Sequence, residues 1–508
     1  MKRLIAMGLT MLLLMGLTAC SSGTSSTESN TEGTVSVSEK NELVMALSVD
    51  PDGLDPQRTT AASTFQITNN IYEPLLTVTP EGELTSALAD SWTVSEDGLT
   101  ITFTLRADAQ FSNGNPCDAD AVVASFERLK AEDSPRAGDY ANIISMEAVD
   151  AQTVVFTMGT LDVAALSSFA YPWAAIVDVT VADTLTNQPV GTGPYVLEQW
   201  IPQQSLTLTR NETYPGTVNI ETVEFRMMPD AASQISAFQN GELDIITVSG
   251  DQVGAFENNP DYKVIQAPAN SLQLMAMNLD NEALSDVRVR QAINYAVDKD
   301  ALIETVWWGY GQKIGSHYPT VLKEYVDHSE DYTYDPDRAR ELLAEAGYSD
   351  GLTLQMYLPQ NYTAYVNAGQ VIADQLEQVG IHCEITIVEW ATWLSDVYTN
   401  RQYDLTVVGH TGRLDPYVLL ARYDTESGEN YFNYSNPEVD QLLADYQSEQ
   451  DEAARTEMVQ RIQEILAEEV PALYIQDPIS LYVTQSDVEG FVTYPIDIYE
   501  MKNVSFAS

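Results

Sequence analysis

The thiol of Cys20 is the first group in this sequence whose setting indicates chemistry. It ends the run Leu17-Thr18-Ala19-Cys20, which follows an apolar stretch over residues 4–17 and two cations, Lys2-Arg3. A charged start, an apolar middle and small residues before a cleavage point are typical of a secretory signal. The stretch is too short and one-sided for a membrane-spanning helix. A cysteine at the first position after cleavage would offer its sulfur for attachment of a lipid.

The run that ends at Cys20 resembles the cleavage site of a bacterial lipoprotein signal. The resemblance implies cleavage before Cys20, a diacylglyceryl group on its sulfur and acylation of the new amino group. The alternative is an ordinary secretory signal that contains this cysteine by accident. Residues 21–38 are Ser, Thr, Gly, Asn and Glu with only two valines, so they predict a flexible tether. We therefore expect a signal peptide over 1–19 and a lipidated cysteine with its tether over 20–40.

The other reactive side chains form no catalytic pattern. The sequence has no His-Glu-x-x-His, Gly-x-Ser-x-Gly, Walker A or Cys-x-x-Cys motif. Its four histidines, His317, His328, His382 and His410, lack metal-ligand spacing. We expect a protein that is not an enzyme, with no cofactor and no metal site assigned. A hydrolase remains the competing class.

The composition limits the classes of partner. The chain has 508 residues, with 24 Lys and Arg against 75 Asp and Glu, for a formal net charge of −51. Nucleic-acid binding needs a basic surface, so no nucleic-acid partner is expected. The acidic surface is expected to keep an exported protein soluble. Cys117 and Cys383 are predicted to be buried thiols and not a disulfide.

Strand and helix signals alternate along the chain. Trp92-Thr93-Val94 and the alternating run 99–105 surround Asp97-Gly98, which predicts a hairpin. Residues 153–157, 222–227 and 384–388 are further predicted strands. The sequence predicts three helices that begin with a capping residue, at Asp335-Pro336, Asn436-Pro437 and Ser285-Asp286. The first of these helices is predicted to end at Gly347. This mixture predicts an α/β protein, and its length predicts two or three domains.

A series of short motifs runs from about Glu42 to the C-terminus. They are Pro51-Asp52-Gly53-Leu54-Asp55-Pro56, Tyr72-Glu73-Pro74-Leu75-Leu76, Leu88-Ala89-Asp90-Ser91-Trp92, Phe103-Thr104-Leu105-Arg106, Phe111-Ser112-Asn113-Gly114, Pro189-Val190-Gly191-Thr192-Gly193-Pro194-Tyr195, Asp286-Val287-Arg288-Val289-Arg290-Gln291-Ala292, and Tyr334-Asp335-Pro336 leading to Ala346-Gly347-Tyr348. Each motif is weak alone, but their order and spacing are specific. Together they resemble the solute-binding proteins of peptide and nickel ABC importers, family 5.

The resemblance implies an α/β, two-lobed periplasmic-binding-protein-like fold (type II, cluster C) with an extra domain inserted in the first lobe. Ligand would lie between the lobes and be enclosed when a hinge closes. The expected boundaries are 41–76, 181–272 and 481–508 for lobe I, 77–180 for its inserted domain, and 273–480 for lobe II.

The resemblance also indicates ligand contacts. Oligopeptide binders use a tryptophan at the position of Trp390 to line side-chain pockets. They continue with Gly-Trp, two residues and an Asp that pairs with the peptide's amino group. Counting from Tyr403-Asp404 without gaps puts Gly409-His410 at the Gly-Trp pair and Arg413 at the Asp. An arginine here implies an anionic ligand group, whereas a shifted loop would leave Arg413 in solvent and give the amine to Asp415.

Arg136 is a second cation of interest, because it lies near where nickel-chelate binders offer an arginine to ligand carboxylates. Those binders also have a histidine about a dozen residues beyond an Asp-Pro pair, which is Asp415-Pro416 in this chain. The corresponding residues 425–430 contain no histidine. That difference counts against a nickel site with such a ligand, although His410 stays a candidate metal ligand or hydrogen-bond donor to a carboxylate.

The family resemblance therefore implies the substrate-binding lipoprotein of an ABC importer. It would capture a short peptide or peptide-like, carboxylate-bearing solute and deliver it to permease subunits with their ATPase. We expect a monomer, held on the outer face of the cytoplasmic membrane through Cys20. The alternative ligand is a nickel or other metal chelate. A surface receptor or an enzyme on the same scaffold is a further alternative.

Overall fold

A computed structural model describes residues 40–507 of the protein. Its main element is a 12-stranded sheet with the order β16-β15-β17-β13-β18-β11-β1-β10-β9-β8, in which β12 and β14 also pair with β18. Parallel and antiparallel pairs both occur, so the prediction of a mixed α/β protein is confirmed. The predicted signal peptide, Cys20 and residues 21–39 of the tether lie outside the described residues.

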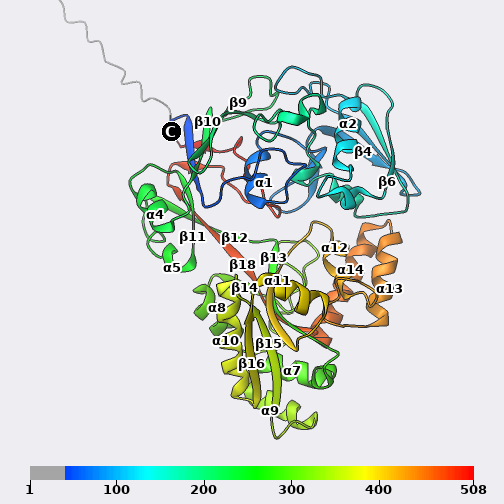
Figure 1. Cartoon of the computed structure of the whole chain (residues 1–508), viewed down its shortest axis with the longest axis vertical. Helices are drawn as coiled ribbons and strands as arrows, with labels where there is room; N and C mark the ends of the chain where they lie inside the picture. Colours follow the sequence, from blue (N-terminus) through cyan, green and yellow to red (C-terminus); the bar gives the residue numbers. More distant parts are fainter. Residues whose placement is uncertain (1–39, 508) are drawn as a thin grey trace, which may run out of the picture. The chain divides into compact units, whose positions relative to one another are not determined.

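Strand β18 (Ala472–Gln485) joins the two halves of this sheet, as Figure 1 shows. Residues 472–476 of β18 pair with β13 (Ser271–Met277), whereas residues 481–484 pair with both β11 (Ile245–Val248) and β12 (Tyr262–Pro268). The predicted boundaries 272/273 and 480/481 fall inside β13 and β18, respectively. Both strands would therefore be shared between the predicted lobes.

The half of the sheet beyond β11 contains the N-terminal strand and a three-strand meander. Its strands are β1 (Glu42–Leu47), β8 (Tyr195–Ile201), β9 (Ser205–Arg210) and β10 (Thr222–Met227). The helices of this part are α1 (Ala62–Thr68), α4 (Ala231–Gln239) and α5 (Gly250–Val253).

The half of the sheet beyond β13 alternates strands with longer helices. Its strands are β15 (Leu352–Pro359), β16 (Ile381–Val388) and β17 (Leu405–Thr411), while the short strand β14 (Gly311–Lys313) pairs with β18. Its helices are α6 (Glu282–Ser285), α7 (Val287–Ala296), α8 (Lys299–Trp307), α9 (Pro336–Glu345), α10 (Thr363–Glu377), α11 (Trp390–Thr392), α12 (Pro416–Leu420), α13 (Pro437–Ser448) and α14 (Glu452–Glu469).

A separate four-stranded antiparallel sheet forms between residues 89 and 158. Its order is β4-β5-β7-β6, and its buried face packs with α2 (Ala119–Leu129) and α3 (Ala165–Ser168) in one hydrophobic cluster. Two small sheets complete the fold, β2 (Leu76–Val78) with β3 (Leu84–Ser86) and β19 (Val488–Glu489) with β20 (Ser505–Phe506). The strands of the four-stranded sheet are β4 (Ala89–Val94), β5 (Thr100–Leu105), β6 (Ile143–Ala148) and β7 (Thr153–Met158).

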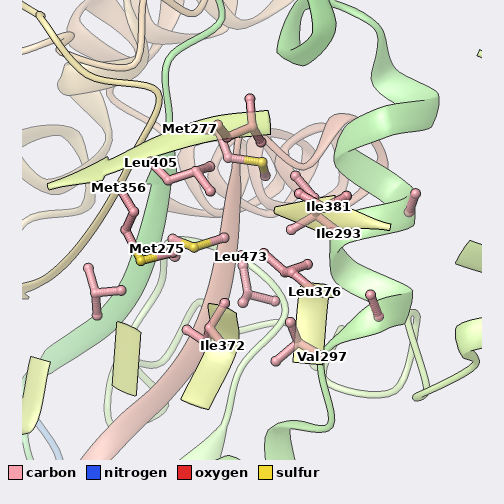
Figure 2. Packing of buried hydrophobic residues seen from close by; sticks show 14 of the residues in the cluster. Met275, Met277, Ile293, Val297, Met356, Ile372, Leu376, Ile381, Leu405 and Leu473 are labelled. Atoms are coloured by element: carbon pink, nitrogen blue, oxygen red, sulfur yellow. The ribbon is translucent and has the colours of Figure 1, made fainter. Parts of the chain in front are cut away.

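The hydrophobic side chains gather in distinct clusters within these parts. Figure 2 shows one cluster, in which Met275 of β13, Ile293 of α7 and Leu376 of α10 point toward one another. All three side chains are fully buried. Burying such side chains is worth roughly 1.5–3 kcal/mol each, so this cluster fixes the two helices against the sheet.

The local signals read from the sequence are confirmed. Strands β4 and β5 pair antiparallel around Asp97-Gly98, and Gly98 adopts a φ of +69° that favours glycine. The other predicted strands occur as β7, β10 and β16. The side chains of Asp335, Asn436 and Asp286 accept hydrogen bonds from the first-turn amides of α9, α13 and α7, as N-caps do.

The two cysteines in the described residues are free thiols. Cys117 is buried and Cys383 is half-buried, and burial raises the pKa of the Cys383 thiol to about 12. Among residues 40–507, no helix combines the length and apolar character that spanning a bilayer requires.

Candidate functional site

A pocket of about 500 Å³ lies where segments far apart in the sequence meet. Its lining comes from the start of α1, residues 171–173, the turn between β12 and β13, the segment after β17, and residues 493–499. Both predicted arginines, Arg136 and Arg413, line it. The fold thus brings together two cations that are separated by more than half of the chain.

Arg413 lies two residues beyond the end of β17, whose pairing with β13 fixes the start of this segment. Its side chain is half-buried, and it forms no ion pair within 4.0 Å in the part of the chain that the structure describes. The backbone around it is held in place, since Asn270 Nδ2 donates to the carbonyl oxygen of Pro495 at 2.9 Å and to that of Arg413 at 3.4 Å. The backbone of Arg413 is therefore fixed at the pocket, and its guanidinium is available to an anion.

Arg136 is held by an aromatic ring. Its guanidinium carbon lies 4.1 Å from the centroid of the Trp173 ring, and Trp173 stacks on Tyr171 with centroids 4.3 Å apart and planes 7° apart. Its nearest carboxylate oxygen, on Asp139, is 3.7 Å away. Its buried Nε has no hydrogen-bond partner among the described residues. A cation on a ring face is oriented without using its hydrogen-bond donors.

Asp497 also lines this pocket, and sequence reasoning missed it. Desolvation by the surrounding protein raises the pKa of its carboxyl, and the positive charge of Arg413 acts in the opposite direction. A second missed group is Asn270, whose buried Oδ1 has no hydrogen-bond partner in residues 40–507. Neither residue belongs to a motif, so no signal in the sequence could have found them.

Trp390 and His410 line a second pocket, of about 310 Å³, with Tyr362 and Tyr365. Trp390 stacks on Trp393 with centroids 4.8 Å apart, and its ring meets Tyr362 edge-on. The first two pockets share Ser271 and Thr411 in their linings, so they are adjacent. None of the residues that line the second pocket is an Asp, Glu, Lys or Arg, so its wall is aromatic and polar without formal charge.

His410 uses both of its ring nitrogens inside the protein. Arg422 Nη1 lies 3.0 Å from His410 Nδ1 and can only donate, so Nδ1 accepts. His410 Nε2 must then carry the proton and donate to the hydroxyl of Tyr431 at 3.0 Å. These hydrogen bonds define His410 as a neutral ring that carries its proton on Nε2.

His317 continues this network and was not selected from the sequence. Its Nε2 lies 3.2 Å from His410 Nδ1, so His317 donates from Nε2. Its Nδ1 then accepts from the hydroxyl of Tyr423 at 2.8 Å. Desolvation and the charge of Arg422 hold the pKa of both histidines well below the usual range.

Asp415 faces a third pocket, of about 470 Å³, which shares no lining residue with the first. Its Oδ1 accepts from the amide of Tyr417 at 2.8 Å and caps α12, and its Oδ2 accepts from the hydroxyl of Tyr446 at 3.2 Å. Burial raises its pKa to about 6. The structure thus places Asp415 apart from the two arginines.

The described residues contain no group of three or more His, Cys, Asp and Glu side chains that could hold a metal ion. What the first pocket offers instead is the positively charged donors of two arginines, the carboxyl group of Asp497, and the side-chain amides of Gln66 and Asn270. Such a set can bind a solute through a carboxylate and a second polar group.

Comparison with known proteins gives the family. Residues 83–431 match the bacterial extracellular solute-binding proteins, family 5, in the middle region of that family. The chain is 28% identical to the dipeptide-binding protein of Escherichia coli (strain K12), over 91% of this chain and 94% of that protein. It is 27% identical to the glutathione-binding protein of the same strain, over 85% of this chain and 88% of that protein.

The fold agrees with this result. The structure of HbpA2 from Haemophilus parasuis superposes with a TM-score of 0.86 at 26% identity, covering 92% of this chain and all of that one. The predicted type II binding-protein fold is confirmed, and so is the prediction of a solute-binding protein that is not an enzyme. This chain belongs to the bacterial extracellular solute-binding proteins of family 5.

Proposed function

We propose that this protein is the substrate-binding lipoprotein of an ABC importer and that it captures a short peptide or peptide-like solute through a carboxylate. One observation carries the ligand class: Arg136 and Arg413 line one pocket, and Arg413 has no ion pair in the described part of the chain. A partly desolvated arginine without a partner is costly, and a ligand carboxylate removes that cost through charge-assisted hydrogen bonds.

The amino group of a peptide would find Asp497 in the same pocket. Desolvation raises the pKa of this carboxyl group. The positive charge of a ligand ammonium would act in the opposite direction and favour the ionised form. The aromatic pocket of Trp390, Tyr362 and Tyr365 would take an uncharged side chain of the same ligand. The names of the relatives, a dipeptide-binding and a glutathione-binding protein, agree with this ligand class.

We propose that capture is coupled to closure of two lobes, because the first pocket is lined from both sides of the crossing strand β18. The segment after β17 would move with one lobe, and residues 493–499 with the other. The proposed lobes keep the boundaries given above, with an inserted domain over 77–180. Cys20 would anchor the protein, and ABC permease subunits would receive the solute.

A metal chelate is the alternative ligand, and the contacts of His410 count against it. Its Nδ1 already accepts from Arg422 and its Nε2 donates to Tyr431. Ligation of a metal by either nitrogen would break one of these hydrogen bonds and leave a buried polar group unpaired. The two arginines could still bind the carboxylates of a chelate, so the ligand must be identified directly.

The test has two steps. Mass spectrometry of the small molecules released from the purified protein by denaturation identifies the ligand that it carries. Calorimetric titration of the ligand-free protein then compares dipeptides with free carboxylates against the same dipeptides as C-terminal amides. We expect the free acids to bind and the amides to bind much more weakly. Equal affinity for both series would refute carboxylate recognition.

A further inference from the structure

The end of β17 and the segment that follows it line three pockets in succession. Gly409 and His410 line the aromatic pocket, Gly412 and Arg413 line the arginine pocket, and Leu414 to Pro416 line the pocket that contains Asp415. The first two share Ser271 and Thr411 in their linings, but the arginine pocket and the Asp415 pocket share no lining residue. The arginine pocket and the Asp415 pocket are therefore separated where the chain passes from Arg413 to Leu414.

Two residues form this closure, which we call the partition. The amide of Leu414 donates to the hydroxyl of Tyr171 at 3.0 Å, and the Leu414 side chain packs against the hydrophobic cluster around the four-stranded sheet. Tyr171 lines the arginine pocket and stacks on Trp173, which also carries Arg136. The partition thus connects the segment of Arg413 to the ring stack that holds the other arginine.

The two sides of the partition differ in charge. One side carries Arg136 and Arg413. Arg136 lies on the Trp173 ring that stacks on Tyr171, and the positive charge of Arg413 acts to lower the pKa of Tyr171. On the other side, the acidic residues Asp415, Glu83, Glu324 and Glu452 outnumber the two cations of the lining, Lys323 and Arg455, and Lys323 is paired with Glu452. A ligand carboxylate therefore has a favourable place on the arginine side and an unfavourable one beyond the partition.

We propose that Tyr171 and Leu414 form an end stop that sets the length of the ligand at its carboxylate end. This inference rests on the proposed function, because it assumes that a carboxylate lies at Arg413. A peptide would end at the partition with its terminal carboxylate on the arginine side. A longer peptide, which has an amide in place of this carboxylate, would meet the Tyr171–Leu414 contact and be rejected by steric conflict.

Opening the partition should admit the longer ligand into the Asp415 pocket. The probe pair is dialanine amide and the same dipeptide extended by lysine amide. Both lack the terminal carboxylate and differ only in the added lysine, whose positive end suits the acidic lining. Free dialanine tests the proposed function separately. The variant is Tyr171→Phe combined with Leu414→Ala, which removes the hydroxyl and the apolar side chain but keeps the ring that stacks on Trp173. Val163→Ala is the matched control, because Val163 lines the Asp415 pocket and not the arginine pocket.

Calorimetric titration gives the ratio of the two affinities for each protein. In the wild type and in Val163→Ala, we expect the extended peptide to bind roughly tenfold more weakly, or worse, as a site does when it must reject added atoms. In the double variant, this ratio should fall toward one. Thermal unfolding and hydrogen exchange at the Leu414 amide show that the variant folds and that the contact has opened.

The outcomes separate the two proposals. If free dialanine and other free-acid dipeptides fail to bind the wild type, the proposed function is wrong and the end stop is overturned with it. If free dialanine binds but the extended peptide binds the wild type as well as dialanine amide does, only the end stop is overturned. If the folded double variant with an opened contact still rejects the extended peptide, the partition does not set ligand length.

Discussion

Replacing Arg413 by alanine should weaken a carboxylate-bearing dipeptide by about thirtyfold. Truncation of one partner of a desolvated charge pair typically costs about 2–5 kcal/mol. Arg413 is half-buried, and Asp497 already lies within reach of its electrostatic field, so the lower end of the range applies. A loss of about 2 kcal/mol corresponds to about a thirtyfold rise in Kd.

Calorimetric titration with one dipeptide as free acid and as amide measures the effect. The amide should lose little affinity in Arg413→Ala, since it offers no carboxylate. Arg413→Lys keeps the charge but loses the paired donors, so it should fall between the wild type and alanine. Arg340→Ala is the control for net charge, because Arg340 is exposed and pairs with Asp337 on α9. Equal weakening of acid and amide by Arg413→Ala would refute the pairing.

The buried histidines should make the free energy of unfolding depend on pH. The pKa of His317 is lowered in the folded state, so the unfolded chain binds more protons. The free energy of unfolding should therefore fall as pH drops below about 6.5. Chemical denaturation of His317→Gln between pH 5 and 8 should show a smaller loss on the acid side, and an unchanged pH slope would contradict the neutral pair. Asp477 has the opposite sign, since burial raises its pKa to about 7 and its contribution is lost as pH rises toward that value. The cost of Asp477→Asn should therefore shrink between pH 5 and pH 8, as measured by urea unfolding, and a cost that grows would be evidence against it. Cys20→Ala should release the protein from the membrane fraction or leave it unprocessed, because it removes the proposed site of lipid attachment and stable anchoring needs about two acyl chains. Full membrane retention of the processed variant would argue against lipidation.

Local structure could be predicted from the sequence because short-range physics determines it. The N-cap at Asp335 depends on residues within one turn, and so does the turn at Asp97-Gly98. The side chains of Ala339 and Leu342, three residues apart on α9, are both buried, as the apolar face of an amphipathic helix is. None of these features needs knowledge of a distant segment.

The site could be predicted only in part, because long-range contacts build it. Arg413 and Arg136 were each selected by resemblance to different binders, and nothing in their spacing indicates that they line one pocket. Asp415 follows Arg413 by two residues, yet the partition of Tyr171 and Leu414 puts it in another pocket. His410 looked available for a ligand or a metal, but its nitrogens are used by Arg422 and Tyr431, at positions that no spacing rule connects.

The strong negative charge of the protein gives a reason for a zwitterionic ligand. A chain with a formal net charge of −51 repels a free anion at a distance, although this repulsion is screened beyond about 8 Å at physiological ionic strength. A peptide with one carboxylate and one ammonium group has no net charge, so it approaches the protein without this penalty. Its two charges become distinguishable only inside the pocket, where Arg413 and Asp497 present opposite signs. In the proposed function, the negative charge of the protein therefore disfavours the close approach of simple anions, and the pair of Arg413 and Asp497 selects peptides.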